Sequence, residues 1–158
     1  SLNPNKVVLI NGVGSLPGKY NRKNIFEKFN SKGFKFMSII SSQAMVSANC
    51  VLSEGVQIMP GAILNADVFI GENTLVNSGA IIEHDCKVGS HNHIAPGAVL
   101  CGTVSTGLGV HVGAGANIIQ LIDIGDFSVV GAGVTLTKNL ESQKVVYSDR
   151  LIKIKDFI

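Results

Sequence analysis

The sequence is poor in aromatic residues, in proline and in charge of either sign. Aromatic residues make up 6% of the 158 residues, tryptophan is absent, and proline occurs only 4 times. The formal net charge is +2, without a block of basic or acidic residues, so nothing resembles a nucleic-acid footprint. Hydrophobic residues nevertheless make up 46% of the chain. This excludes an intrinsically disordered protein, which combines low hydrophobicity with high charge.

Targeting and membrane signals are also missing. No apolar run approaches the roughly 18 residues of a membrane span, and residues 1–5 lack a signal-peptide pattern. The three cysteines, Cys50, Cys86 and Cys101, are odd in number and have no metal-ligand spacing. We therefore expect reduced thiols and a cytoplasmic protein without a membrane span.

The dominant feature is a repeat of six residues. An aliphatic residue returns every sixth position and is interrupted only by Thr106: the series is Val46, Leu52, Ile58, Leu64, Ile70, Val76, Ile82, Val88, Ile94, Leu100, Thr106, Val112, Ile118, Ile124, Val130 and Leu136. Four residues after most of these stands a small or β-branched residue, with Asn92 as a polar exception.

A period of six fits neither a helix nor a lone strand, but it fits short strands joined by tight turns. We predict a mainly β fold: a left-handed parallel β-helix with three strands per coil, preceded by a partial α/β subdomain. The aliphatic series points inward, and residue n lies beneath residue n+18. The hexads from 46 to 141 make a little over five coils.

The flanks have different patterns. Residues 6–10 and 34–40 are predicted as strands, and 21–32 as a helix that ends before Gly33. We expect residues 1–42 to be the C-terminal part of a truncated α/β subdomain, 43–141 to be the β-helix, and 142–158 to be a tail. Within that tail, 150–158 alternates like an edge strand.

The register places the four histidines. His84 lies beneath Gly102, and His93 lies beneath His111. Because His84 and His93 are half a coil apart, they point to opposite sides of one prism and can meet only across an interface between subunits. In Glu83-His84-Asp85, a histidine beside carboxylates can act as a general base, or the run can be a solvated turn.

Several other residues have competing interpretations. His93 and His111 can bind a metal or can simply be stacked by the register. His91 is expected to be a surface turn residue. Cys101 points outward and is a weak nucleophile candidate. The loop 11–18 resembles a phosphate-binding loop only loosely, because a bare Gly-x-Gly is a weak signal.

Residues 77–98 (NSGAIIEHDCKVGSHNHIAPGA) and Gly102 carry a family resemblance. They resemble bacterial sugar O- and N-acetyltransferases of the sialic-acid O-acetyltransferase type, which include enzymes that act on nucleotide-linked amino sugars. The resemblance implies an acetyl-CoA-dependent, homotrimeric transferase of surface-glycan synthesis without a metal. It also implies that the α/β subdomain holds the sugar nucleotide.

By this resemblance, His84 is the general base, Asp85 is its acidic partner, and the Gly102 amide is an oxyanion donor. His93 matches a residue of the neighbouring subunit that contacts the acetyl-CoA thioester.

The same resemblance assigns three backbone or glycine positions. Ala114 matches a backbone contact to the pantetheine arm, and Ala132 one to the adenosine end. Gly12 matches a substrate-side glycine at the end of a strand.

The chain departs from the family at both ends of the solenoid. Ser41-Ser42 replaces the usual His-Pro, Tyr147-Ser148-Asp149-Arg150 replaces the usual Gly-x-Pro-Ala-Lys, and the glycine-rich nucleotide turn is missing. Two other functions stay open on the residues alone: a metalloenzyme like the γ-class carbonic anhydrases, and a non-catalytic assembly module. The sequence names neither the sugar nor the accepting atom.

Overall fold

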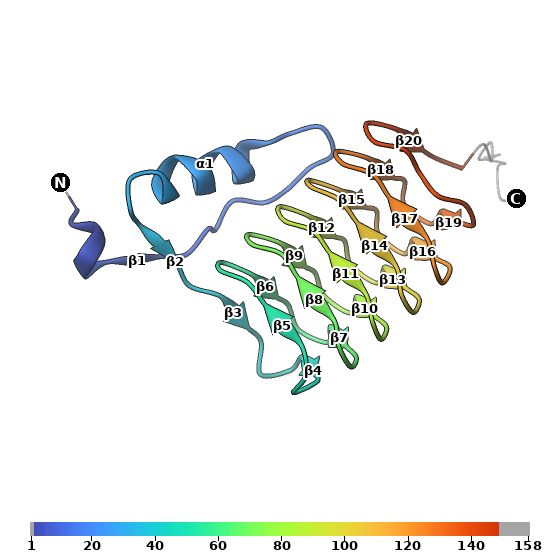
Figure 1. Ribbon diagram of the computed structural model, residues 1–158, viewed down its shortest axis with the longest axis horizontal. Helices are drawn as coiled ribbons and strands as arrows, with labels where there is room; N and C mark the ends of the chain where they lie inside the picture. Colours follow the sequence, from blue (N-terminus) through green and yellow to red (C-terminus); the bar gives the residue numbers. More distant parts are fainter. Residues whose placement is uncertain (1, 149–158) are drawn as a thin grey trace, which may run out of the picture.

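The computed structural model describes residues 2–148 as a parallel β-solenoid with one α-helix at its side (Figure 1). Short strands form three parallel sheets of seven, six and five strands, which wind through about 6 turns. The left-handed parallel β-helix predicted from the six-residue repeat is confirmed. Neighbouring strands pair 18 residues apart, as Ile81 does with Val99.

We call the three sheets faces 1, 2 and 3. Face 1 contains β3 (Ile39–Ile40), β6 (Gln57–Ile58), β9 (Leu75–Val76), β12 (His93–Ile94), β15 (His111–Val112), β18 (Val129–Val130) and β20 (Val145–Val146). Face 2 contains β4 (Met45–Val46), β7 (Ile63–Leu64), β10 (Ile81–Ile82), β13 (Val99–Leu100), β16 (Asn117–Ile118) and β19 (Thr135–Leu136). Face 3 contains β5 (Val51–Leu52), β8 (Phe69–Ile70), β11 (Lys87–Val88), β14 (Ser105–Thr106) and β17 (Asp123–Ile124).

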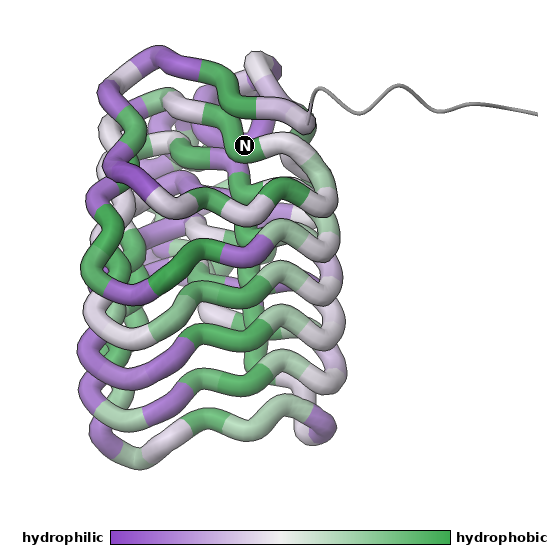
Figure 2. Tube along the Cα trace, turned by 90° about the vertical axis from the view of Figure 1, so that its right-hand side faces the viewer, coloured by the Kyte–Doolittle hydropathy of each residue, from purple (hydrophilic) through white to green (hydrophobic). Residues whose placement is uncertain are grey.

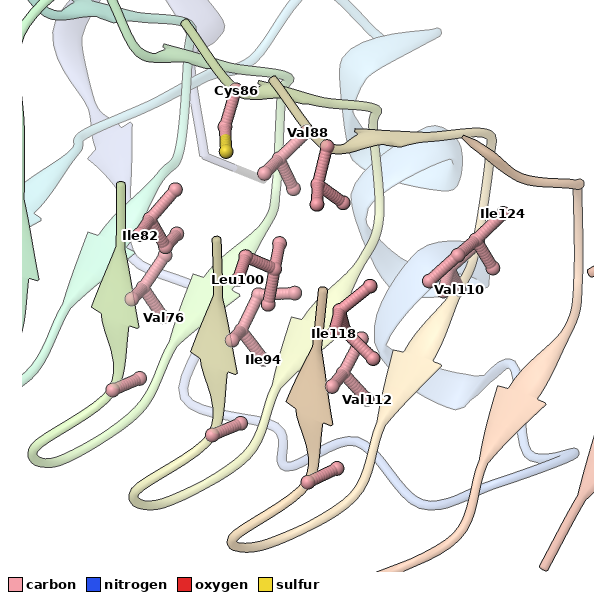
Figure 3. Close-up of a cluster of buried hydrophobic side chains, with 14 of the residues drawn as sticks. Val76, Ile82, Cys86, Val88, Ile94, Leu100, Val110, Val112, Ile118 and Ile124 are labelled. Atoms are coloured by element: carbon pink, nitrogen blue, oxygen red, sulfur yellow. The ribbon is translucent and has the colours of Figure 1, made fainter. Parts of the chain in front are cut away.

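The core is the inward column that the repeat predicts. Hydrophobic positions recur one above another in the stacked coils (Figure 2). Figure 3 shows Ile82, Ile94 and Leu100 pointing into the interior, where all three are fully buried. Cys86 is buried at a corner, and all three cysteines are free, as expected.

The two polar exceptions in the repeat are partners. The Asn92 side chain is fully buried and donates from Nδ2 to Thr106 Oγ1. Its Oδ1 accepts from the Val110 amide, and Thr106 Oγ1 also accepts from the Gly89 amide at 3.1 Å. Each polar group therefore has a partner, which burial requires.

The solenoid extends beyond 43–141 at both ends. The stretch predicted as one strand over 34–40 is two strands: β2 (Lys35–Phe36) and β3, which pairs with β6 in face 1. Between them, Ser38 Oγ donates to the Ser53 carbonyl at 3.0 Å and accepts from the Val56 amide, so the chain bends there.

At the far end, β20 pairs with β18 through Val129 and Val145. This spacing is 16 residues rather than 18, because a bridge between Ile124 and Leu140 closes a shorter corner. The predicted tail thus begins with another rung of face 1. The edge strand expected at 150–158 lies outside the described residues.

The N-terminal segment is a small α/β unit. It contains a 3₁₀ turn η1 (Pro4–Lys6), β1 (Val8–Leu9), α1 (Asn21–Asn30) and β2, which pairs in parallel with β1. The first strand is shorter than 6–10 because the 3₁₀ turn occupies its start. The helix ends two residues before 32, and Gly33 follows with φ +84°. No helix within 2–148 is long and apolar enough to cross a membrane.

Helix α1 and the loop before it run along the stack, beside face 1 (Figure 1). The Phe26 ring packs 4.5 Å from that of Phe36 and 5.5 Å from that of His91. A Cβ on Gly55 would lie 2.9 Å from Phe26, so only glycine lets the helix approach this corner. The helix therefore covers the corner between faces 3 and 1 and leaves the other two corners open.

Candidate functional site

His84 stands at the corner between faces 2 and 3. Its Nδ1 lies 2.8 Å from Asp85 Oδ2. Because a carboxylate only accepts hydrogen bonds, Nδ1 carries a proton, and in the neutral ring Nε2 is the nitrogen with a free lone pair. Asp85 has φ 60°, a left-handed conformation that aspartate tolerates better than most residues.

Gly102 lies directly above this ring, as the register predicts. The Thr103 amide donates to the His84 carbonyl at 2.9 Å, which fixes the position of one coil relative to the other. A Cβ on Gly102 would stand 2.7 Å from both Cε1 and Nε2 of His84. The basic nitrogen therefore faces the Gly102 backbone, and the Gly102 amide makes no hydrogen bond within the described residues.

The His84 corner is open within one chain. The His84 and Asp85 side chains are 62% and 57% exposed. Beside them, Glu83 Oε2 accepts from Asn65 Nδ2 at 2.6 Å, which keeps that carboxylate away from His84. Residues 2–148 of one chain supply the proton acceptor but no wall that would exclude water.

His93 lies on the opposite side, in the middle of face 1, and is buried. Its Nδ1 donates to the Ser15 carbonyl at 3.1 Å, so Nε2 accepts from Asn77 Nδ2 at 3.1 Å. Burial lowers its pKa. Asn77 is a site residue that the sequence pattern did not single out. The available signal was its place 16 residues before His93, at the corner one coil below.

His93 and His111 meet as the register predicts. Their rings pack edge to face, with centroids 4.8 Å apart. Burial, and then His93, lower the pKa of His111 to about 4. Within residues 2–148, no third histidine, cysteine or carboxylate joins them to form a group that could hold a metal ion.

His91 corrects one expectation. Rather than a surface turn residue, it is a buried side chain beneath helix α1. Its Nδ1 is hydrogen bonded to Asn73 at 2.8 Å, and burial lowers its pKa. The repeat places it at an outward corner, but it does not show that a helix covers that corner.

Ala114 and Ala132 are exposed at the corner between faces 1 and 2. They lie one coil apart, and the Ala114 carbonyl accepts from the Gly133 amide at 2.9 Å. Ala132 borders an open depression of about 800 Å³, lined by residues 131–135 and 146–148. Small exposed residues therefore occupy this corner in two successive coils, at 114–115 and 132–133.

Gly12 is exposed just after β1, with open space where a Cβ would stand. Its neighbour Asn11 is buried and donates from Nδ2 to the Arg22 carbonyl and to Asn73 Oδ1, each at 3.0 Å. Gln57 Nε2 donates to the Asn11 carbonyl at 2.9 Å. The loop 11–18 is therefore docked on face 1, and Gly12 is at its open edge.

Comparisons with known proteins agree with this geometry. The bacterial transferase hexapeptide family (six repeats) matches residues 67–102. The chain is similar to PerB from Caulobacter crescentus, solved with CoA and GDP-perosamine: 34% identity, TM-score 0.79, covering 82% of this chain and 63% of PerB. It is also similar to the acetyltransferase domain of PglB from Neisseria gonorrhoeae: 28% identity, TM-score 0.82, covering 89% of this chain and 67% of that domain.

WeeI from Acinetobacter baumannii shares the fold, with 24% identity and TM-score 0.77 over 81% of this chain and 63% of WeeI. No curated protein matches. The chain spans less than two thirds of the length of PerB. The resemblance to bacterial sugar acetyltransferases seen in residues 77–98 is confirmed.

Proposed function

We propose that this protein transfers the acetyl group of acetyl-CoA to a sugar used in bacterial surface glycans. The acceptor is a nucleotide-linked amino sugar or a sialic-acid-like sugar. The observation that carries the proposal is the His84 corner: a free Nε2 that faces the unsubstituted Gly102 backbone. The similarity to PerB, which was solved with CoA and GDP-perosamine, supports the choice of donor and acceptor.

The proposed reaction needs no covalent enzyme intermediate, because a thioester is already activated. The amine or hydroxyl of the sugar attacks the thioester carbonyl while His84 Nε2 takes its proton. The Gly102 amide donates to the developing oxyanion. The C–S bond then breaks, the proton passes from His84 to the leaving thiolate, and CoA and the acetylated sugar are released. Asp85 holds the ring throughout.

The site is proposed to lie between subunits of a homotrimer. His84 is largely exposed, whereas His93, Ala114 and Ala132 lie on face 1 or at its border with face 2. A neighbouring chain can therefore bring its His93 to the thioester and its two alanine backbones to the CoA arm. Contact through His93 Nε2 requires Asn77 to release that nitrogen, and Gly12 lies toward the acceptor sugar.

We place the reaction in the cytoplasm. The three cysteines are free, and Cys50 and Cys101 are partly accessible, which suits a reducing compartment.

The test is thiol release from acetyl-CoA with a panel of amino-sugar nucleotides and nonulosonic acids. With the best acceptor, His84→Ala should lower kcat by about 10²-fold or more, the usual scale for a general base. Lys87→Ala is the control, since Lys87 is exposed on face 3 and should keep normal turnover. Near-normal turnover of His84→Ala would remove the general-base assignment. Absence of acetyl-CoA binding in calorimetry would favour an assembly module instead.

A further inference from the structure

Arg22, the second residue of helix α1, joins three separate parts of the fold. It is only 4% exposed. Its Nε donates to the carbonyl of Asn73, at a corner of the solenoid, at 3.2 Å. Its Nη1 donates to the carbonyls of Asn11 and Val13, at 2.8 and 3.0 Å. One buried guanidinium therefore connects the helix, the loop 11–18 and the solenoid.

The backbone on both sides of Gly12 is held by this guanidinium. The two carbonyls that Nη1 contacts belong to Asn11 and Val13, the neighbours of Gly12. Gln57 Nε2 donates to the same Asn11 carbonyl at 2.9 Å, and the Val13 amide donates to Asn11 Oδ1 at 3.3 Å. The carbonyls of this turn therefore face into the fold.

The same contacts turn two amides outward. The peptide bonds that the structure describes are all trans, and in a trans peptide the N–H group points opposite to the C=O group. The amides of Gly12 and Gly14 follow the two carbonyls that face Arg22, so both point away from the guanidinium. Neither makes a hydrogen bond within residues 2–148. Both glycines are exposed, with open space where a Cβ would stand, so a ligand can reach the two donors.

Arg22 is an unfavourable choice if stability alone is required. Its three acceptors are neutral carbonyls, and its Nη2 is buried without a partner among the described residues. Burial lowers its pKa to about 10, because a buried charge without a counter-charge is disfavoured. Its advantage is geometric. The planar guanidinium presents its donors in a fixed fork, whereas lysine has one ammonium on a flexible stem.

We propose that Arg22 is a positioning residue for the acceptor sugar. By holding the carbonyls beside Gly12, it presents the Gly12 and Gly14 amides to oxygen atoms of that sugar. The inference rests on the proposed function, in which Gly12 lies toward the acceptor. Ser15 is held separately by His93 Nδ1 at 3.1 Å, so a change at Arg22 should act on the acceptor side and leave His93 in place.

The test measures the two KM values in the thiol-release assay, with the acceptor that gives the fastest release. Arg22→Lys keeps the charge and loses the fork. It should raise the KM for the acceptor about tenfold or more, the effect of two lost hydrogen bonds of average strength. The KM for acetyl-CoA should change by less than twofold, because the CoA contacts are proposed to come from the coils.

Two further variants separate positioning from stability. Thr106→Val weakens the buried core of the solenoid and should lower the melting temperature without changing either KM. Gly14→Ala places a methyl group beside an outward amide, in open space and at a φ that is not left-handed. It should raise the acceptor KM severalfold and leave the melting temperature unchanged, so it tests the proposal even if Arg22→Lys folds poorly.

The outcomes distinguish this role from the proposed function itself. Absence of thiol release from the natural chain with every acceptor would remove the acetyltransferase function and this role with it. Normal release by the natural chain, with the acceptor KM unchanged in Arg22→Lys and Gly14→Ala, would overturn the role of Arg22 alone. An equal rise of both KM values in Arg22→Lys would also overturn it, because it would indicate a general loss of structure.

Discussion

Replacing Gly102 by alanine tests the His84 corner with a single methyl group. Gly102 does not have a left-handed φ, so the backbone accepts alanine without strain. The new Cβ would stand 2.7 Å from Cε1 and Nε2 of His84, whereas ordinary contacts begin near 3.4 Å. The ring must therefore withdraw by about 0.7 Å or rotate away, since the Gly102 backbone is fixed by the next coil.

The expected loss follows from that displacement. Withdrawal moves the basic nitrogen from its position and strains the 2.8 Å bond between His84 and Asp85. A misplacement of about 1 Å typically reduces turnover by about 10²-fold. Stability should change by less than about 0.5 kcal/mol, because an exposed side chain can swing into solvent.

The assay is acetyl-CoA thiol release, with a double-mutant cycle to identify the cause. If alanine at 102 acts through His84, then adding Gly102→Ala to His84→Ala should change kcat by less than about threefold. An unchanged kcat in the single variant Gly102→Ala, or full additivity of the two losses, would refute the reasoning.

Three further predictions concern stability. Thr106→Val removes the acceptor for buried Asn92 Nδ2 and should lower the free energy of unfolding by about 1–3 kcal/mol in urea titrations; a smaller loss when Asn92→Ala is added confirms the pairing. The lowered pKa of His111, about 4 against 6.5, means that the unfolded chain binds more protons between these values. Stability should therefore fall as pH drops through this window, by up to about 1.4 kcal/mol per pH unit, and His111→Phe should flatten the fall. Leu121→Asn should raise the melting temperature, because Leu121 is 70% exposed with φ 62° and asparagine adopts this conformation more readily; a decrease contradicts this.

The repeat predicts the solenoid because its period is a direct consequence of strand geometry. Each inward position must be apolar, and residue n lies beneath residue n+18 in the next coil. Counting alone therefore places His84 beneath Gly102. The same counting puts His93 beneath His111. The register also separates His84 from His93, which leads to the proposal of a site between subunits.

The far end of the solenoid could not be predicted in this way. β3 continues the count, because Ile40 lies one hexad before Val46 and pairs with Ile58, but β20 follows a corner that is two residues shorter. The place of β20 comes from hydrogen bonds to the neighbouring coil, and these bonds leave no pattern in side-chain type. Counting hexads stops where the spacing changes.

The contacts of the N-terminal loop could not be predicted from the sequence either. Nothing in the spacing of Asn11, Arg22 and Asn73 indicates that they meet, because they come from a loop, a helix and a corner far apart in the sequence. Burial of His91 has the same origin. Docking of one element on another depends on shape, and a periodic pattern describes only the element that repeats.

The central claim is that a proton acceptor on one chain works with a partner chain across an interface. Its most direct test mixes His84→Ala with His93→Ala, co-refolded in equal amounts, with each variant nearly inactive alone. If each site takes His84 from one subunit and His93 from the next, about one site in three is intact in every mixed trimer, which is about a quarter of all sites after random mixing. Thiol release should then recover to about a quarter of the natural rate. Mixed trimers that form but remain as inactive as either variant would contradict the shared site.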